Sequence, residues 1–411
     1  MDTIKMDHND EVFLGDPMIS DNSSIVGGKG SGGVHLATLT DPLAGESFIL
    51  TMAAAATRHG TSIMPCMSNP NVLLYSVMAP AITHGRASPD SHPNNKNYVG
   101  FGGAAAWQWA IGIWPFKDVF YTNTTSGSGA ANVPNAGADK GMREDQPWTH
   151  TLVAALSGGG VAPGDVVGGS DTALIMQTCR ADGTLLKPAS PATYIDRTWE
   201  SLFRLPDAGG SGAGVTGLGE TSSADAVVSG GLLYKIFYVL PPTQRSTIES
   251  VDVGLSSTGS HVVYQQVKYG GVISSVAKFG AGADAVNIHA VQCQGGEGCD
   301  KTQLFIAAPI LSNGWAILGE TTKIVAVSAQ RIVSVVASSG TGTDTAAVKL
   351  ELIGVAGERV EMAFMKPDGS IISTTCTVGM SGRVQMLAGI PMGAEACQHV
   401  GLVMKHDDAS C

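Results

Sequence analysis

The stretch Arg86-Ala87-Ser88-Pro89-Asp90 follows an apolar run at residues 77–82 and places an arginine and a carboxylate four residues apart. The carboxyl ends of parallel strands lie at one edge of a sheet, so a buried strand that ends in polar residues delivers them to that edge. The segment Thr3-Ile4-Lys5-Met6-Asp7 has the same form. Residues i and i+2 of a strand share a face, so Lys5 is expected beside Asp7. We predict that Asp7 and Asp90 meet at this edge as a catalytic pair.

Residues 1–206 alternate short apolar runs with helix-like segments, which is typical of βα units and a parallel sheet. The strand-like runs end at Asp7, Cys66, Arg86, Asp118 and Asp165. The helix candidates are residues 43–59, 71–79, 104–111, 149–156, 171–181 and 194–203. Five runs are too few for an eight-stranded barrel, which takes about 250 residues. We therefore expect part of a (β/α)8 TIM barrel, about strands 4 to 8, with the first βα units outside this chain.

The sequence pattern changes in the second half of the chain. A length of 411 residues also favours two domains. A glycine-rich segment at residues 207–219 is predicted to be a linker. Residues 220–411 then carry short β-branched and apolar runs separated by turn residues, which predicts an antiparallel β-sandwich. The expected strands are residues 232–239, 261–267, 272–276, 323–327, 332–336, 347–353 and 360–364. Pro367-Asp368-Gly369 is expected to be a turn.

The charge and the hydropathy of the sequence limit the classes of partner that we expect. The formal net charge is −11 and no basic run compensates it, which argues against nucleic acid or an anionic membrane surface as a partner. No apolar run reaches the roughly 18 residues of a transmembrane helix, and the first residues have no signal-peptide pattern. The chain is expected to be soluble, with a neutral ligand. Its compartment stays undecided.

The sequence indicates no cofactor and no metal site. The seven cysteines include no CxxC pair, so no zinc ribbon is expected, and Cys293 and Cys299 are equally compatible with a disulfide or free thiols. Asp7, His8 and Asp10 are too close together at a strand end to face one ion. The glycine-rich residues 27–33 lack the spacing of a phosphate-binding loop.

Six short motifs resemble, in order and spacing, those of one enzyme family. This is the α-galactosidase and raffinose synthase group, or seed imbibition proteins, of glycoside hydrolase family 36. The motifs are Ile4-Lys5-Met6-Asp7, Cys66-Met67-Ser68, Arg86-Ala87-Ser88-Pro89-Asp90, residues 114–120, residues 150–165 and residues 181–186. The sequence departs from the family pattern at Pro89, where many members have an aspartate, and at Phe116, which replaces another.

The resemblance implies a retaining glycosidase or transglycosidase that acts on α-galactosides, such as raffinose-family sugars or galactinol, and needs no cofactor. It implies that Asp7 is the nucleophile and that Asp90 is the acid/base, which should retain its proton until the leaving oxygen takes it. The residues implied to bind the oligosaccharide are Lys5, Arg86, Asp118, Asp165 and Trp114. The alternative is a truncated, catalytically inactive carbohydrate-binding relative.

Several of these residues also have a purely structural interpretation. Asp7 could belong to a frayed polar N-terminus, and Arg86 could form an ordinary salt bridge at the rim. Asp118 and Asp165 could cap loops instead of touching a ligand. Trp107, Trp109 and Trp114 are expected near the rim, where one stacks on a sugar and core packing accounts for the others.

Overall fold

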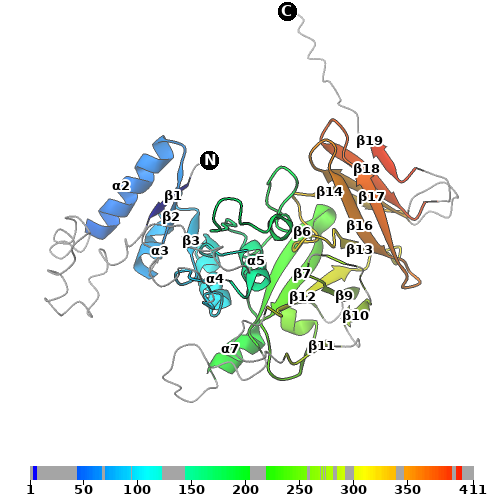
Figure 1. The fold of residues 1–411 in the computed structure, drawn as a ribbon, viewed down its shortest axis with the longest axis horizontal. Coiled ribbons are helices and arrows are strands. Elements are labelled where there is room, and N and C mark those ends of the chain that lie inside the picture. The colour runs from blue at the N-terminus through cyan, green and yellow to red at the C-terminus, as the bar shows by residue number, and fades with distance from the viewer. Residues whose placement is uncertain are drawn as a thin grey trace, which may run out of the picture.

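The structure is a computed structural model, and it describes residues 3–6, 44–66, 70–93, 95–122, 144–203, 219–256, 260–268, 270–271, 273, 275–280, 285–291, 300–338, 347–390 and 395–399. In Figure 1 the N-terminal helices and short strands lie at one end. A large sheet occupies the middle, and the C-terminal sheets lie at the other end.

The N-terminal part is a series of parallel strand pairs connected through helices. Strand β1 (Thr3–Met6) pairs in parallel with β2 (Ser62–Pro65), and β3 (His84–Arg86) pairs in parallel with β4 (Trp114–Phe116). A parallel bridge from Ile63 to Ile82 connects the two pairs. A further parallel bridge joins Phe120 to Pro163. The described residues contain no closed barrel.

Four helices alternate with these strands, close to the residues predicted from the sequence. They are α2 (Ala44–Arg58), α3 (Pro70–Ser76), α4 (Phe101–Ala110) and α5 (Pro147–Leu156). The helix α7 (Asp196–Phe203) also falls where it was expected. The prediction for residues 171–181 is wrong in extent, because α6 (Thr172–Ile175) makes one turn and Cys179 then bridges Leu185.

A six-stranded sheet forms the centre of the molecule, in the order β10-β9-β12-β7-β6-β5, and all its pairs are antiparallel. Its strands are β5 (Thr193–Tyr194), β6 (Thr221–Val228), β7 (Leu232–Val239), β9 (Ser260–Gln266), β10 (Ala277–Gly280) and β12 (Gln303–Pro309). Strand β5 precedes the predicted linker, of which residues 207–218 lie outside the described residues. The sheet therefore includes residues from both sides of the predicted domain boundary.

Both faces of this sheet are buried, as β7 illustrates. Ile236 and Tyr238 point into the core that contains α4 and α5, whereas Phe237 and Val239 point into a second core on the opposite face. The second core includes the small pair β8 (Ser246–Ile248) and β11 (Val286–Ile288). Alternate side chains of a strand point to opposite faces, so an almost continuous apolar run indicates a strand covered on both sides.

Two further antiparallel sheets complete the C-terminal part, which is all-β as predicted. One contains β13 (Ala316–Gly319), β16 (Arg359–Met365) and β17 (Ile371–Thr377). The other contains β14 (Ile332–Ala337), β15 (Val348–Ile353), β18 (Arg383–Ala388) and β19 (Cys397–His399). Their apolar faces belong to the same core, and a disulfide between Cys376 and Cys397 joins the two sheets. Cys293 and Cys299 lie outside the described residues.

The turn at Pro367-Asp368-Gly369 is confirmed, because it connects β16 to β17 and the Gly369 amide donates to the Lys366 carbonyl (2.9 Å). The strand predicted at residues 323–327 is wrong. This segment is buried but its backbone is bent, because Ile324 N–H donates to the Gln177 carbonyl (2.9 Å) and Lys323 Nζ donates to the Met176 and Cys179 carbonyls. The described residues of the predicted strand 272–276 are also not in a strand.

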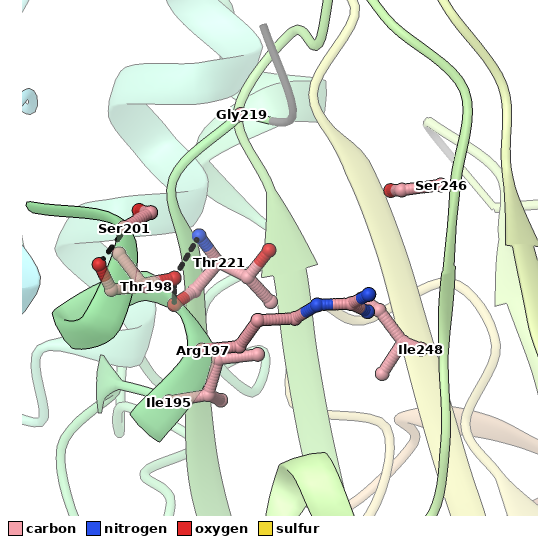
Figure 2. A pocket seen from close by; sticks show the side chains of 8 residues that line it. All are labelled: Ile195, Arg197, Thr198, Ser201, Gly219, Thr221, Ser246 and Ile248. Carbon is pink, nitrogen blue, oxygen red and sulfur yellow. Dashed lines mark hydrogen bonds between the residues drawn. The ribbon is translucent and has the colours of Figure 1, made fainter. Parts of the chain in front are cut away.

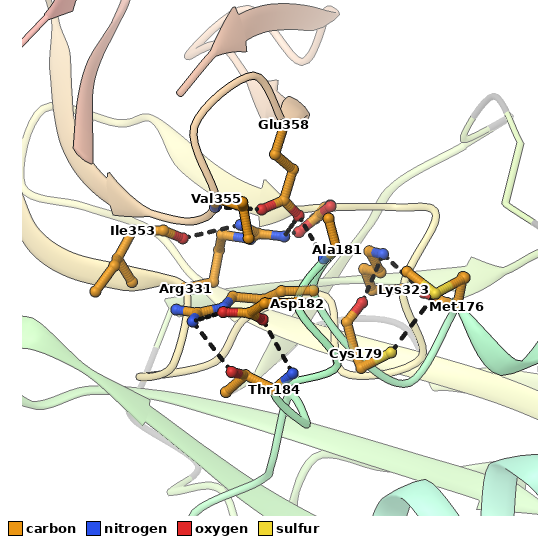
Figure 3. A network of polar contacts seen from close by, with 12 residues as sticks. Met176, Cys179, Ala181, Asp182, Thr184, Lys323, Arg331, Ile353, Val355 and Glu358 are labelled. Carbon is orange, nitrogen blue, oxygen red and sulfur yellow. Dashed lines mark hydrogen bonds and ion pairs between the residues drawn. The ribbon is translucent and has the colours of Figure 1, made fainter. Parts of the chain in front are cut away.

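A buried ion-pair network joins the segment at residues 176–184 to the C-terminal sheets (Figure 3). The Arg331 guanidinium is 1% exposed and contacts Glu320 (2.9 Å) and Glu358 (2.6 Å). Glu358 also accepts a hydrogen bond from the Ala181 amide (3.1 Å). Burial raises the pKa of the Glu320 carboxyl, although the Arg331 charge opposes this. The network fixes the N-terminal part against the β region.

We predict that Arg331→Leu lowers the free energy of unfolding by about 3–5 kcal/mol, because it leaves two buried carboxylates without their cation. Urea unfolding followed by tryptophan fluorescence measures this change. Arg359→Leu is the matched control, since Arg359 is exposed on β16. Equal losses in the two variants would contradict the assigned role of Arg331.

Candidate functional site

Two of the polar residues singled out in the sequence, Arg86 and Asp118, lie at the carboxyl ends of parallel strands. Arg86 is the last residue of β3, and Asp118 follows the end of β4 by two residues. Because β3 and β4 are parallel, with Arg86 opposite Phe116, both residues lie at the same edge. The preceding apolar run at residues 77–82 is mostly turn, so the strand begins later than the hydropathy alone suggests.

Arg86 contacts two carboxylates. Its Nη1 lies 2.7 Å from Asp90 Oδ1 and 3.3 Å from Asp118 Oδ2. The Arg86 side chain is 2% exposed, and Gln108 Nε2 donates a hydrogen bond to the Arg86 backbone carbonyl (3.0 Å). The two carboxylates fix the guanidinium, since a buried cation is stable only when it is paired and hydrogen-bonded, whereas Gln108 holds the backbone of Arg86.

Asp118 anchors the turn that carries Asp90. Its Oδ2 accepts a hydrogen bond from the Ser91 amide (3.0 Å), and the Asp118 amide donates to Ser88 Oγ (2.9 Å). The Asp118 side chain is buried and contacts Arg86 as well. We call Arg86, Ser88, Asp90, Ser91 and Asp118 the rim cluster. Within it, the contacts of Asp118 match the loop-capping interpretation of this residue.

Asp90 has a different environment from the one expected of a proton-retaining acid. Its side chain is 51% exposed and pairs with the Arg86 guanidinium. Its backbone carbonyl accepts a hydrogen bond from Asn95 Nδ2 (2.6 Å). Asp90 is therefore accessible to a ligand, and its orientation depends on Arg86.

Asp165 also caps a loop. Its two carboxylate oxygens accept hydrogen bonds from the amide (2.9 Å) and the hydroxyl (2.6 Å) of Thr122. Thr122 Oγ1 in turn accepts a hydrogen bond from the Asp171 amide (2.7 Å). Asp171 caps α6 through the Leu174 amide (3.0 Å). These contacts connect the segment after Phe120 to the start of α6.

Two of the predicted site residues cannot be placed by their side chains. Asp7 lies outside the described residues, and the structure describes only the backbone of Lys5 in β1. Strand β1 runs parallel to β2, with Met6 opposite Pro65. The chain therefore leaves β1 at the same edge as the carboxyl ends of β2, β3 and β4.

Trp114 is not brought to the rim cluster. It is the first residue of β4 and lies opposite His84, whereas Asp118 follows the other end of that strand. At about 3.3 Å per residue, the two backbones are roughly 13 Å apart. The Trp114 ring packs at 4.8 Å from the Trp109 ring, and Lys187 Nζ lies 5.9 Å from its centre. The three predicted rim tryptophans are on α4 or at the start of β4.

A buried polar cluster lies next to the rim cluster, and sequence reasoning did not identify it. Lys117, Glu144 and His150 are each at most 1% exposed. His150 Nε2 lies 3.6 Å from Glu144 Oε2, and the Lys117 ammonium donates to the Asp118 carbonyl (3.2 Å). The Tyr98 ring packs edge-on against the His150 ring, with 5.0 Å between the ring centres. We call these four residues the inner cluster.

Burial decides the ionisation of the inner cluster. It lowers the pKa of Lys117 to about 7, although Asp118 and Glu144 favour the charged ammonium. Burial, together with the nearby Lys117 charge, lowers the pKa of His150 well below its ordinary value. His150 is therefore neutral at neutral pH, whereas Lys117 is close to its titration midpoint.

Asp300, from the second half of the chain, holds the helix that carries His150. Its carboxylate accepts hydrogen bonds from the Trp148 (3.1 Å) and Thr149 (2.9 Å) amides at the start of α5, and it pairs with Lys268 (2.6 Å). The first amides of a helix lack intrahelical partners, so a carboxylate there stabilises the helix. The sequence gives no local signal for this contact, because the partners are about 150 residues apart.

A small pocket lies away from the rim cluster, between α7 and the strands β6 and β8 (Figure 2). Thr198 and Thr221 form hydrogen bonds across one side, and the Arg197 side chain extends toward Ile248. Its lining contains no acidic side chain. This pocket therefore lacks the pair of carboxylates that glycoside hydrolysis requires.

The described part of the chain has no group of three or more acidic, histidine or cysteine side chains that could hold a metal ion. Among the same residues, no helix combines the length and hydropathy needed to cross a bilayer.

The chain was also compared with known proteins. A scan against protein-family models finds no match, and a search of the curated proteins finds none either. The resemblance to glycoside hydrolase family 36 thus depends on the six motifs alone.

We predict that Asp118→Asn accelerates hydrogen exchange of the Ser91 amide by about tenfold or more, because a hydrogen bond to a charged acceptor contributes roughly 1.5–3 kcal/mol. Amide exchange followed by NMR measures this rate. Asp165→Asn is the control, since this loop-capping carboxylate accepts hydrogen bonds from Thr122 and not from Ser91. An unchanged rate in Asp118→Asn would show that Asp118 does not anchor the turn.

We predict that His150 makes the protein less stable as the pH falls below 6.5. The unfolded chain then binds a proton that the folded state excludes, so the free energy of unfolding decreases by at most about 1.4 kcal/mol per pH unit from this group. Unfolding experiments between pH 7 and 5 should show a smaller decrease for His150→Gln than for the wild type. His59→Gln, at an exposed position, should retain the full decrease.

Proposed function

We propose that the protein is a retaining glycosidase or transglycosidase acting on α-galactosides, with Asp7 as nucleophile and Asp90 as acid/base. The observation that carries this proposal is the rim cluster, in which Arg86 orients a ligand-accessible Asp90 at the carboxyl edge of parallel strands. In this proposal the strands β1 to β4 belong to a partial (β/α)8 barrel, and the C-terminal sheets form a β-sandwich.

The strand order supports a functional pair. Asp7 follows β1, and Asp90 follows β3, with β2 between them. At about 4.8 Å between neighbouring strands, the backbones of β1 and β3 are about 10 Å apart. Two carboxylates that extend toward each other across this distance can approach the roughly 5–5.5 Å separation of a retaining pair.

The proposed reaction is a double displacement. Asp7 attacks the anomeric carbon while the Asp90 carboxyl group protonates the leaving oxygen, which gives a glycosyl ester on Asp7. Asp90 then deprotonates water or an acceptor sugar, whose oxygen attacks the anomeric carbon and releases Asp7 as a carboxylate. Because Asp90 is paired with Arg86 here, the proposal requires that ligand binding changes this pair before proton transfer. The remaining proposed contacts to the sugar are those of Lys5 and Arg86.

The environments of the predicted site residues favour the alternative, a catalytically inactive carbohydrate-binding relative. Asp90 is half exposed and ion-paired, and Asp118, Asp165 and Trp114 are engaged in contacts within the protein. In that case Asp90 and Arg86 would bind sugar hydroxyl groups without a covalent step. Asp90→Asn would then reduce sugar affinity in a chain that has no turnover.

We predict that Asp7→Asn and Asp90→Asn each reduce turnover of aryl α-galactosides or galactinol by at least about a hundredfold, because each removes a group that forms or breaks a bond. Product release by the full chain measures turnover. Asp196→Asn, at an exposed position on α7, should leave turnover unchanged. Turnover retained in Asp7→Asn would remove this residue from the mechanism, and turnover absent from the wild type would favour the binding protein.

A further inference from the structure

Lys117 is one of the most deeply buried ionisable residues in the described part of the chain. Its side chain is completely buried, and its ammonium lies 5.5 Å from the centre of the Phe120 ring. Burying an ammonium is costly unless it has charged or polar partners. Lys117 directly precedes Asp118, the anchor of the rim cluster. A lysine at this position calls for an explanation beyond packing, because an apolar side chain would fill the same space at a lower cost.

The charged groups around Lys117 come from three parts of the fold. Asp118 is the next residue, and Glu144 lies just before α5. His150 lies on α5 and experiences the Lys117 charge. Arg86, at the end of β3, is connected to the cluster through Asp118. Lys117 thus connects the other residues of the inner cluster to Asp118 of the rim cluster.

We propose that Lys117 is a positioning residue for the rim cluster: its buried ammonium holds the backbone at Asp118, and its charge balances the Asp118 carboxylate that orients Arg86 and Asp90. The contact that supports this is the hydrogen bond from Lys117 Nζ to the Asp118 carbonyl (3.2 Å). The catalytic consequence rests on the proposed function, whereas the electrostatic coupling between Lys117 and Asp118 does not.

The coupling has a defined pH dependence. Burial lowers the pKa of Lys117 to about 7, so the ammonium loses its proton as the pH rises through neutrality. The rim and inner clusters together then become more negative by one charge. Asp118 loses a neighbouring cation, and the balance between its contacts to Arg86 and to the turn at Ser91 changes.

The coupling can be measured without any turnover. The full chain is labelled with ¹³C at the aspartate side-chain carboxyls, and the Asp118 resonance is assigned by its loss in Asp118→Asn. In the wild type this resonance should shift with a midpoint near pH 7. The shift should be absent from Lys117→Met and from Lys117→Arg, whose cation does not titrate in this range.

Lys187→Met is the matched control, because Lys187 is a half-buried lysine beside Trp114 at the opposite end of β4. It should retain the midpoint near pH 7. An Asp118 resonance that shifts in the same way in the wild type and in the Lys117 variants overturns the proposal. Lys117→Arg serves as the second variant if Lys117→Met does not fold.

Measurements of turnover test the catalytic effect of Lys117 separately. If Asp90→Asn abolishes activity, kcat/KM of the wild type should show a transition near pH 7 that Lys117→Met and Lys117→Arg lack and Lys187→Met retains. Lys117→Met should reduce kcat by roughly tenfold or more with a smaller change in KM, and Lys117→Arg should restore part of it, because misplacing a catalytic group slows the chemical step. If the wild type shows no turnover but its Asp118 resonance still shifts with a midpoint near pH 7, the proposed function is refuted and the positioning role of Lys117 stays supported.

Discussion

The burial of both faces of the central six-stranded sheet is the constraint on which the rest of the structure depends. Ile236 and Tyr238 on one face of β7, and Phe237 and Val239 on the other, require a cover on each side. The helices α4 and α5 and the C-terminal sheets share the first core. Because α5 is fixed in this way and capped by Asp300, the inner cluster has a rigid support.

The two polar clusters illustrate different uses of burial. In the rim cluster a buried arginine holds an accessible carboxylate, so the cation fixes the position of a group that remains open to solvent. In the inner cluster the ionisable groups themselves are enclosed, and desolvation changes their proton affinity. Lys117 of the inner cluster and Asp118 of the rim cluster are adjacent in the sequence. The ionisation of the inner cluster is therefore linked to the geometry of the rim cluster.

The sequence predicted those features that depend on neighbouring residues. Arg86 and Asp118 were expected at strand ends because a polar residue follows an apolar run, and the structure places them together. Residues 323–327 were expected to form a strand, but their backbone bonds to the turn at Gln177, which lies far away in the sequence. Lys117, Glu144 and His150 have no common spacing, and only the fold brings them together. The roles of Asp7 and Asp90 in chemistry remain predictions.

The pairing of β5 with β6 has a consequence for how this molecule could be divided. A cut within the glycine-rich segment would remove an edge strand from its sheet and would expose the face of that sheet on which α4 and α5 pack. Neither piece would then retain a complete interior. The β-rich half is therefore not an independent module. A recombinant fragment ending near residue 206 would not reproduce the packing of the intact polypeptide.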